Sequence, residues 1–562
     1  MLALIFMFSF SLAGADASIN WESLVQTEIM ETVLDSFRVY PFTLQVNVEN
    51  LVFLEWMGGS DININFFATY TYLILLASSL SVILAVSTTL SRFWFLVANT
   101  LFIVVLIALK LDLVMLFEST NRLALVFALV AFLPTSYYFH AINKNFSLAF
   151  RIITFLTITG LLALTIHFFS GVERPFLHLA AYGMTVPLIL SLLFIIMVAH
   201  DIMAAFLNAL SSGSMGTTGN WKHFFIISFI YLANLLILYL NETHVIEWDV
   251  LPVNHFVLVA ISAILGIWGF RQREPQYEYL ASFQPGGAIF FLAMGTIFFS
   301  STGYFMANGN DPVIEVFKDI IIYSHFAYGL IFLMYIAANF LSAFTKNLPI
   351  HRILYKPQTM PYFTYRLVGL ITMAAFIFLQ SWKVPVQYSF SGYFNNLGDL
   401  YKINGDPLMA RGYYEEGSIY GQKNHHSNYG LAKIAEEEND VEKAINYYKN
   451  AIERRPTPYS LTNLSNIQYN QNMYFDALFT LQEGRKKFPD NGPVQNNLGL
   501  LYLQSGILDS SLFYLEQSEN SGTSGNAAKN NIMVVLAKSE MKISTDSIIG
   551  IFEQDDAVFH AN

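Results

Sequence analysis

The chain has 562 residues, of which 54% are hydrophobic and 13% are charged. A soluble domain carries about 25% charged residues, so this composition predicts a membrane protein. The formal net charge of -11 argues against a nucleic-acid-binding protein, and the absence of cysteine excludes disulfide bonds, thiolate metal sites and a cysteine nucleophile.

The N-terminal segment 1–17 is short and apolar and ends in Ala15-Asp16-Ala17, a pattern typical of a signal-peptide cleavage site. It lacks the basic residues that usually begin a signal peptide. A short apolar segment or a shortened first span is therefore the alternative.

Segment 18–65 carries the pattern of a β-hairpin. Apolar and polar residues alternate over 42–49, as in a half-buried strand. We expect Glu49-Asn50 to turn the chain into a second strand over 51–56 that ends at Gly58-Gly59. This predicts a small exoplasmic cap on the outer mouth of a helical bundle, either a lid over a cavity or a structural plug.

Ten apolar stretches within 66–385 have about the length that crosses a bilayer. Their approximate ranges are 66–89, 93–115, 122–141, 147–169, 177–200, 222–240, 254–270, 286–305, 320–343 and 363–382. Pro187 lies midway along the fifth stretch and predicts a kink there.

Lysine and arginine concentrate in alternate loops, beginning with the loop after the first apolar stretch, which places those loops in the cytoplasm. Their basic residues are Arg92, Lys144, Arg151, Lys222, Arg271, Arg273, Lys346, Arg352, Lys356 and Arg366. Ten spans then place both ends of the chain outside, in the periplasm of a bacterial inner membrane.

A polar, periodic sequence follows over 391–540. Asn395-Asn396-Leu397-Gly398 recurs as Asn496-Asn497-Leu498-Gly499. Small and large residues return at matching positions in four successive units. They are Leu397, Gly398, Tyr401, Ala410, Tyr414 and Gly417; Leu431, Ala432, Ala435, Ala444, Tyr448, Ala451 and Pro456; Leu464, Ser465, Ala477, Leu481, Gly484 and Pro489; and Leu498, Gly499, Tyr502, Leu515 and Ser518.

These positions resemble the tetratricopeptide repeat family, whose period is about 34 residues. The resemblance implies paired helices stacked into a superhelix whose concave surface binds peptides or proteins. The alternative is an array that only packs on its own membrane domain. In the fourth unit Ser511 replaces the alanine expected in the second helix. A helix near 526–540 would close the array, and 541–562 would form a tail.

Ionisable residues inside apolar stretches are costly and point to function. Glu315 and Asp319 are one helical turn apart in the ninth stretch, and with His325 they are candidates for a proton or ion relay. The alternative is a solvated helix end in which Lys318 neutralises the two carboxylates.

Glu55 and Asp61 in the cap are candidates for the external base of a lipid-dependent glycosyltransferase. No paired-acid signature accompanies them, so this alternative rests on architecture alone.

His200 and His325 differ in depth, so this pair is not expected to ligate haem. His140 near the inside, and His167 and His178 near the outside, leave other pairs, but histidine at the end of a span is more often interfacial than a ligand. We therefore expect no cofactor and no metal.

Together these patterns predict an all-α protein with a polytopic bundle of about ten spans, a tetratricopeptide-like array and a small β-hairpin cap. We expect a membrane scaffold whose array binds a protein or peptide partner in envelope assembly, secretion or glycan export, within a larger membrane complex. A lipid-linked glycosyltransferase or glycan ligase, and an ion-coupled transporter, are the alternatives. No nucleic-acid partner is expected.

Overall fold

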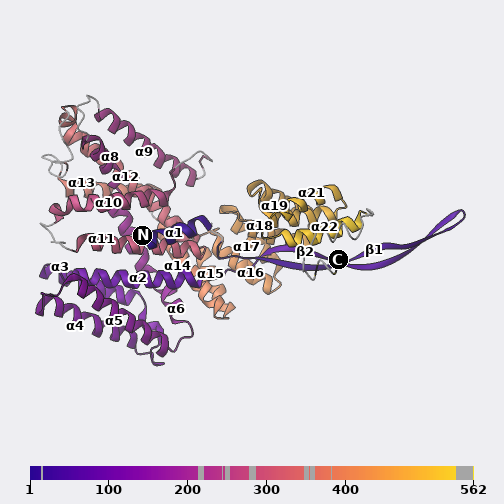
Figure 1. The fold of residues 1–562 in the computed structure, drawn as a ribbon, viewed down its shortest axis with the longest axis horizontal. Helices are drawn as coiled ribbons and strands as arrows, with labels where there is room; N and C mark the ends of the chain where they lie inside the picture. Colours follow the sequence, from indigo (N-terminus) through magenta and orange to yellow (C-terminus); the bar gives the residue numbers. More distant parts are fainter. Residues whose placement is uncertain are drawn as a thin grey trace. The chain divides into compact units, whose positions relative to one another are not determined.

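Figure 1 shows the computed structural model of the chain, which is mostly helical. The structure describes residues 1–13, 17–212, 220–243, 245–246, 248, 253–277, 286–346, 354, 361–380, 383–539, 558 and 561. The chain forms two compact units. The first comprises 1–15, 64–405 and 419–421, and the second comprises 16–63, 406–418 and 422–562. The N-terminal hairpin thus belongs to the same unit as the C-terminal repeats.

The first unit is a bundle of apolar helices. Its α-helices are α1 (Leu2–Ala13), α2 (Phe66–Ser87), α3 (Arg92–Ala108), α4 (Leu123–Tyr137), α5 (Leu148–Phe169), α6 (Pro175–Tyr182), α7 (Thr185–Val198), α8 (Asp201–Ser212), α9 (Asn220–Glu242), α10 (His255–Tyr277), α11 (Gly287–Ala307), α12 (Asp311–Thr345), α13 (Tyr362–Gln380) and α14 (Lys383–Ile403). A 3-10 helix, η1 (Leu111–Val114), and a π-helix, η2 (Tyr138–Ile142), join them.

Each of the ten predicted apolar stretches contains a helix. Among the described residues, eight helical segments are long and apolar enough to cross a membrane. The apolar parts of α3 and α10, Arg92–Ala108 and His255–Arg271, are shorter.

The fifth stretch is broken rather than kinked. Helix α6 ends before Gly183 and α7 begins at Thr185. Pro187 has no N–H to donate to the carbonyl of Gly183, four residues earlier, and its ring would collide with that carbonyl in a continuous helix. The proline therefore explains a break displaced by one turn from the predicted kink.

The segment expected to be a signal peptide or a short apolar segment forms α1, which packs against α11. Ala3 and Met7 are buried in the core of the first unit. A Cβ atom at Gly303 of α11 would lie 2.5 Å from Phe6 Cδ1, so glycine is needed where the two helices meet. In the structure of this chain, α1 is part of the packed bundle.

The hairpin is longer than predicted. Strands β1 (Trp21–Val39) and β2 (Phe42–Gly59) pair in antiparallel fashion and reverse at 40–41. The predicted turn at Glu49-Asn50 is wrong, because both residues lie within β2, opposite Glu31 and Met30. Val48 and Val52 lie in the same phase on either side of these two positions, as a single strand requires.

The second unit continues with helices arranged in successive pairs. They are α15 (Pro407–Tyr420), α16 (His425–Glu437), α17 (Val441–Arg454), α18 (Pro458–Asn470), α19 (Tyr474–Lys487), α20 (Gly492–Gln504), α21 (Leu508–Glu519) and α22 (Gly525–Lys538). The boundary between the two units, after Gly405, falls inside the first predicted repeat.

The turns inside the pairs repeat with the sequence. Asn439, Asn472 and Gly506 have φ values of 59°, 60° and 74°, the left-handed conformation that asparagine and glycine tolerate best. Each allows the next amide to bond back to a carbonyl near the end of the preceding helix, at 2.9–3.0 Å. This turn chemistry fixes how each helix pair closes.

Most of the repeat positions predicted to be small or large are buried as expected, although Tyr401, Pro456 and Tyr502 are half-buried and Pro489 is exposed. Ala444, Tyr448 and Ala451 of α17, and Ala477 and Leu481 of α19, are all inaccessible to solvent. The resemblance to tetratricopeptide repeats is confirmed at the level of packing, because small residues allow the paired helices to approach and large ones fill the remaining space.

Candidate functional site: a strand held by the repeats

Asparagines of the repeats bind the backbone of β2. Asn466 and Asn496 each donate one hydrogen bond, to the carbonyls of Met57 (2.9 Å) and Glu55 (2.8 Å), and three others each make two hydrogen bonds to a single strand residue. In each of these three the side-chain Oδ1 accepts the N–H of one strand residue and Nδ2 donates to the carbonyl of the same residue. The pairs are Asn463 with Gly59 (2.7 and 3.1 Å), Asn497 with Met57 (2.8 and 2.8 Å) and Asn531 with Glu55 (2.9 and 2.9 Å). We call these three pairs the asparagine ladder.

The ladder matches two periods. Asn463, Asn497 and Asn531 are spaced 34 residues apart and lie on α18, α20 and α22, the first helices of successive repeats. Their strand partners are two residues apart, so the N–H and C=O groups of all three point to the same side of β2. One repeat therefore corresponds to one two-residue step of the strand, about 6.6–6.8 Å.

The ladder completes the hydrogen bonding of β2. In an antiparallel pair, alternate residues direct both backbone groups toward the neighbouring strand and the others direct them away. The residues that bond the asparagines are those that point away from β1. Without the ladder their N–H groups would be buried without partners, at a cost of about 1–3 kcal/mol each, whereas the carbonyls of Met57 and Glu55 also accept from Asn466 and Asn496.

Aromatic side chains hold the hairpin on both sides of the ladder. Trp21 of β1 stacks on Tyr459 with ring centres 4.3 Å apart, and Trp56 of β2 stacks on Tyr469 at 4.8 Å. Trp56 is almost fully buried and packs in the core that the repeats form. The hairpin therefore contributes side chains as well as backbone to this interface.

The end of β2 is held by a buried hydroxyl. Tyr429 donates a hydrogen bond to the carbonyl oxygen of Ser60 at 2.7 Å. Burial, followed by the nearby carboxylates of Glu436 and Asp61, raises the pKa of Tyr429 well above its usual range. The hydroxyl consequently stays protonated and remains a donor at any physiological pH.

Charged groups add to the contact of β1. Glu28 accepts a hydrogen bond from Gln504 and lies 3.5 Å from the ammonium group of Lys538. Both partners belong to the last helices of the array. These contacts are partly exposed, so we assign them to orientation rather than to most of the binding energy.

The structure places Glu55 within this interface. Its side chain is 6% exposed, and its carboxylate accepts a hydrogen bond from Asn530 Nδ2 at 3.0 Å. Its backbone is one rung of the ladder. Asp61, the other predicted external base, follows the end of β2, where its backbone carbonyl accepts a hydrogen bond from Asn63 Nδ2. Glu55 and Asp61 therefore both belong to the segment of β2 and its end that the repeats bind.

The cap on the bundle stays a prediction. The contacts described for the hairpin run to α18, α20 and α22 of the array. Sequence reasoning placed the hairpin by its proximity to the first apolar stretch. It missed the asparagines, whose 34-residue spacing was the available signal.

The predicted relay residues of α12 separate into two environments. Lys318 bridges Glu315 and Glu242, with nitrogen–oxygen distances of 3.0 and 3.1 Å. Its ammonium group therefore neutralises carboxylates from two helices, and Asp319 lies in the same turn of α12. His325 is ten residues beyond Glu315, about 15 Å along the helix axis.

His325 is fully buried and internally bonded. Its Nδ1 lies 2.9 Å from the carbonyl oxygen of Ile321, and its Nε2 lies 3.0 Å from Ser262 Oγ. A carbonyl can only accept, so Nδ1 carries the proton and Nε2 accepts from the serine. The structure does not bring Glu315, Asp319 and His325 into one cluster.

A buried polar cluster lies elsewhere in the bundle. Asp201 Oδ1 is 2.5 Å from Arg273 Nη1, and His200 lies between Arg273 and Arg366 at 2.9 and 2.8 Å. A Cβ atom at Gly269 would lie 2.9 Å from both Asp201 and Arg273, so glycine leaves the room that this ion pair occupies. From the sequence, Arg273 and Arg366 were predicted only as basic residues of cytoplasmic loops.

Among the residues that the structure describes, no group of three or more His, Asp or Glu side chains is placed to hold a metal ion.

The fold and the ladder define a protein that combines an apolar helical bundle with a repeat array. Residues 425–458, which include α16 and α17, match the tetratricopeptide repeat family. No curated protein matches the chain. Repeats of this family mediate protein–protein interaction, and here they bind a strand of their own chain.

Proposed function

We propose that the protein is an integral membrane scaffold of the bacterial inner membrane, with the second unit in the periplasm, that recruits a protein partner for envelope assembly, secretion or glycan export. The asparagine ladder carries the proposal. The face of the array formed by α18, α20 and α22 binds β2, so the array holds the hairpin in place. The partner then binds the part of the hairpin that the repeats leave exposed.

The outer half of the hairpin has the character of a binding surface. It extends past the repeat helices (Figure 1). Phe42 pairs with Val39, and Leu44 with Phe37, on one face; all four side chains are between 52% and 70% exposed. The opposite face of the same segment carries polar residues. An exposed apolar face of this kind is typical of protein interaction sites.

Membrane placement is supported by the eight long apolar helices and by the basic loops between them. The chain is naturally free of cysteine, which permits a direct test. Single cysteines at Ser36, Lys144 and Gly522 would be labelled in intact cells with a reagent that does not cross the inner membrane. We expect labelling at Ser36 and Gly522, and labelling at Lys144 only after permeabilisation. The reverse pattern would overturn the orientation.

Partner binding is tested on the full chain purified from cross-linked membranes. The variant Phe42→Ser/Leu44→Ser changes the apolar face, and the control Thr43→Ala/Gln45→Ala changes the polar face of the same segment. We expect a stoichiometric partner that the first variant loses and the control retains. A partner that survives both, and that binds more strongly to Asn497→Ala, would instead use the repeat face by displacing the hairpin. Cross-links to lipid alone would also contradict the proposal.

A further inference from the structure

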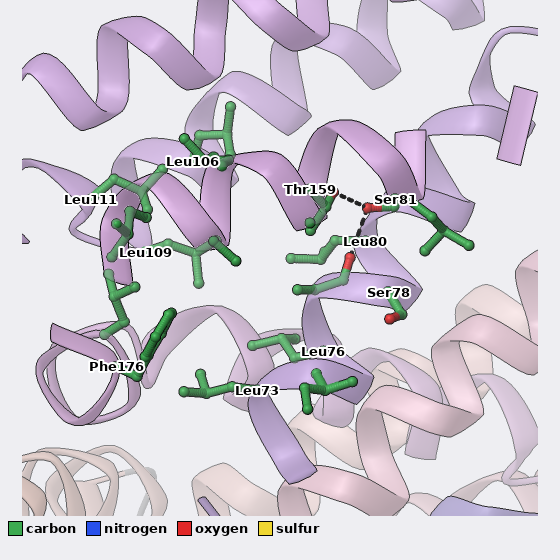
Figure 2. A pocket seen from close by; sticks show the side chains of 18 of the residues that line it. Leu73, Leu76, Ser78, Leu80, Ser81, Leu106, Leu109, Leu111, Thr159 and Phe176 are labelled. Carbon is green, nitrogen blue, oxygen red and sulfur yellow. Dashed lines mark hydrogen bonds between the residues drawn. The ribbon is translucent and has the colours of Figure 1, made fainter. Parts of the chain in front are cut away.

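The first unit contains an apolar cavity of about 430 Å³ between α2, α3, α4, α5, α6 and η1 (Figure 2). Most of its wall is aliphatic or aromatic. Leu76 and Leu80 of α2, Leu106 of α3 and Phe176 of α6 are among the side chains that line it. Its volume lies within the range of small-molecule binding sites.

Four residues with hydroxyl groups line the cavity, Tyr70, Ser78, Ser81 and Thr159, and two of these hydroxyls are already bonded to each other and to their own helices. Ser81 Oγ and Thr159 Oγ1 lie 2.6 Å apart. Each also lies 2.9 Å from a carbonyl of its own helix, that of Ala77 or Phe155. A water molecule needs about two to four polar partners, and this wall leaves few free. The cavity is therefore suited to an apolar occupant.

The cavity reaches the outer surface of the bundle. Ile74 and Tyr70 of α2 line it and are also 66% and 42% exposed. Gly160 of α5 lines it too, and a Cβ atom built there would meet no other atom within 4 Å. The missing side chain thus leaves part of the space open.

We propose that this cavity binds the acyl chain of a bilayer phospholipid. The inference rests on the membrane placement proposed above, because the surface at Ile74 would then face lipid tails. The hydrophobic effect does not drive this binding, because the acyl chain moves from the hydrocarbon of the bilayer and not from water. The gain is dispersion: a void deprives its lining of contact atoms, and a hydrocarbon chain restores them.

The test uses the full chain in phosphatidylethanolamine and phosphatidylglycerol vesicles that contain a phospholipid with a photoactivatable diazirine in its acyl chain. Labelled residues are mapped by mass spectrometry of peptides. Gly160→Trp fills the cavity. Thr157→Trp is the matched control, since Thr157 lies on the same helix, is exposed and does not line the cavity. Ala77→Leu fills the cavity independently from α2.

In the unsubstituted protein we expect labelling at Leu76 and Leu80 inside the cavity, together with labelling at Leu164, which is 54% exposed and outside it. Gly160→Trp and Ala77→Leu should reduce the cavity labels several-fold and leave Leu164 unchanged, and Thr157→Trp should reduce neither. Labelling at Leu164 without cavity labelling would overturn the lipid site while membrane placement stands. Absence of both labels would overturn membrane placement itself.

Discussion

Asn497 accepts a hydrogen bond from the backbone N–H of Met57 and donates one to the carbonyl oxygen of the same residue, both at 2.8 Å and across 440 positions of sequence. The asparagine side chain is an amide, so it supplies what a third strand would supply to β2. A shift of the hairpin by one residue would turn these backbone groups away from the repeats. The ladder therefore fixes the register of docking as well as its strength.

Asn497→Ala should weaken the docking of β2 by about 1–3 kcal/mol, because the N–H of Met57 would stay buried without a partner, while its carbonyl would keep only the hydrogen bond from Asn466 Nδ2 at 2.9 Å. Hydrogen exchange of the intact protein would show faster exchange in peptides that cover 55–59. Asn470→Ala, at an exposed position at the end of α18, is the control. Equal protection in both variants would mean that the ladder contributes little.

Gly59→Ala should undock the end of β2, because the added Cβ would lie 2.5 Å from the Tyr429 hydroxyl and 2.9 Å from Tyr459 Cβ. Such overpacking costs about 1–3 kcal/mol. Gly58→Ala is the matched control, since its Cβ would lie 3.1 Å from the flexible end of Leu24 and 3.4 Å from Asn463 Oδ1, an ordinary van der Waals contact. Limited proteolysis within 50–60 should separate the two, and similar resistance would refute the steric argument.

Gly506→Ala should destabilise the turn between α20 and α21 by about 1–2 kcal/mol, because an alanine at φ 74° brings its Cβ close to the backbone. The position is otherwise open, so the backbone strain acts alone. Gly522→Ala is also open but lacks a positive φ and should change little. The free energy of unfolding of both variants is measured by urea titration, with susceptibility of the repeats to protease as the readout. A neutral Gly506→Ala would contradict this account.

Ser511→Ala should stabilise the fourth repeat by about 1 kcal/mol. The Ser511 hydroxyl is buried and has no hydrogen-bond partner within the described structure, and alanine is the better helix former. Ser518→Ala on the same helix should have the opposite effect, since its hydroxyl donates to the carbonyl of Gly492 at 2.8 Å. Hydrogen exchange of α21 should show opposite signs, and two changes of the same sign would be evidence against the prediction.

The repeats should lose stability as the pH falls below about 6.5. His425 is buried, and burial, then Arg455 and His426, lower its pKa well below its usual value. The unfolded chain therefore binds a proton that the folded array does not, which favours unfolding by up to about 1.4 kcal/mol per pH unit. Urea unfolding of the repeats at several pH values measures this slope, and His425→Gln should reduce it. An unchanged slope in that variant would assign the effect to other groups.

Local patterns predicted the elements and many of their buried faces. Ala444 and Tyr448 are buried because their spacing alone places them on the inner side of a paired helix. The alternation over 42–49 correctly indicated a strand, but it carried no information about where that strand turns. The turn prediction failed because Glu49-Asn50 has turn-forming composition, whereas the pairing with β1, which continues through both positions, decided the outcome.

The sequence by itself determined the apolar helices, the repeat period and the existence of a hairpin, because each depends on residues within a few turns or one repeat of each other. Only the tertiary structure decided that the hairpin occupies the repeats. Hydrogen-bonding asparagines and alternating strands specify what kind of partner each needs, yet neither specifies which segment hundreds of residues away will supply it. Glu55 shows the consequence: an acidic residue in a presumed cap became a buried rung once its backbone met Asn531.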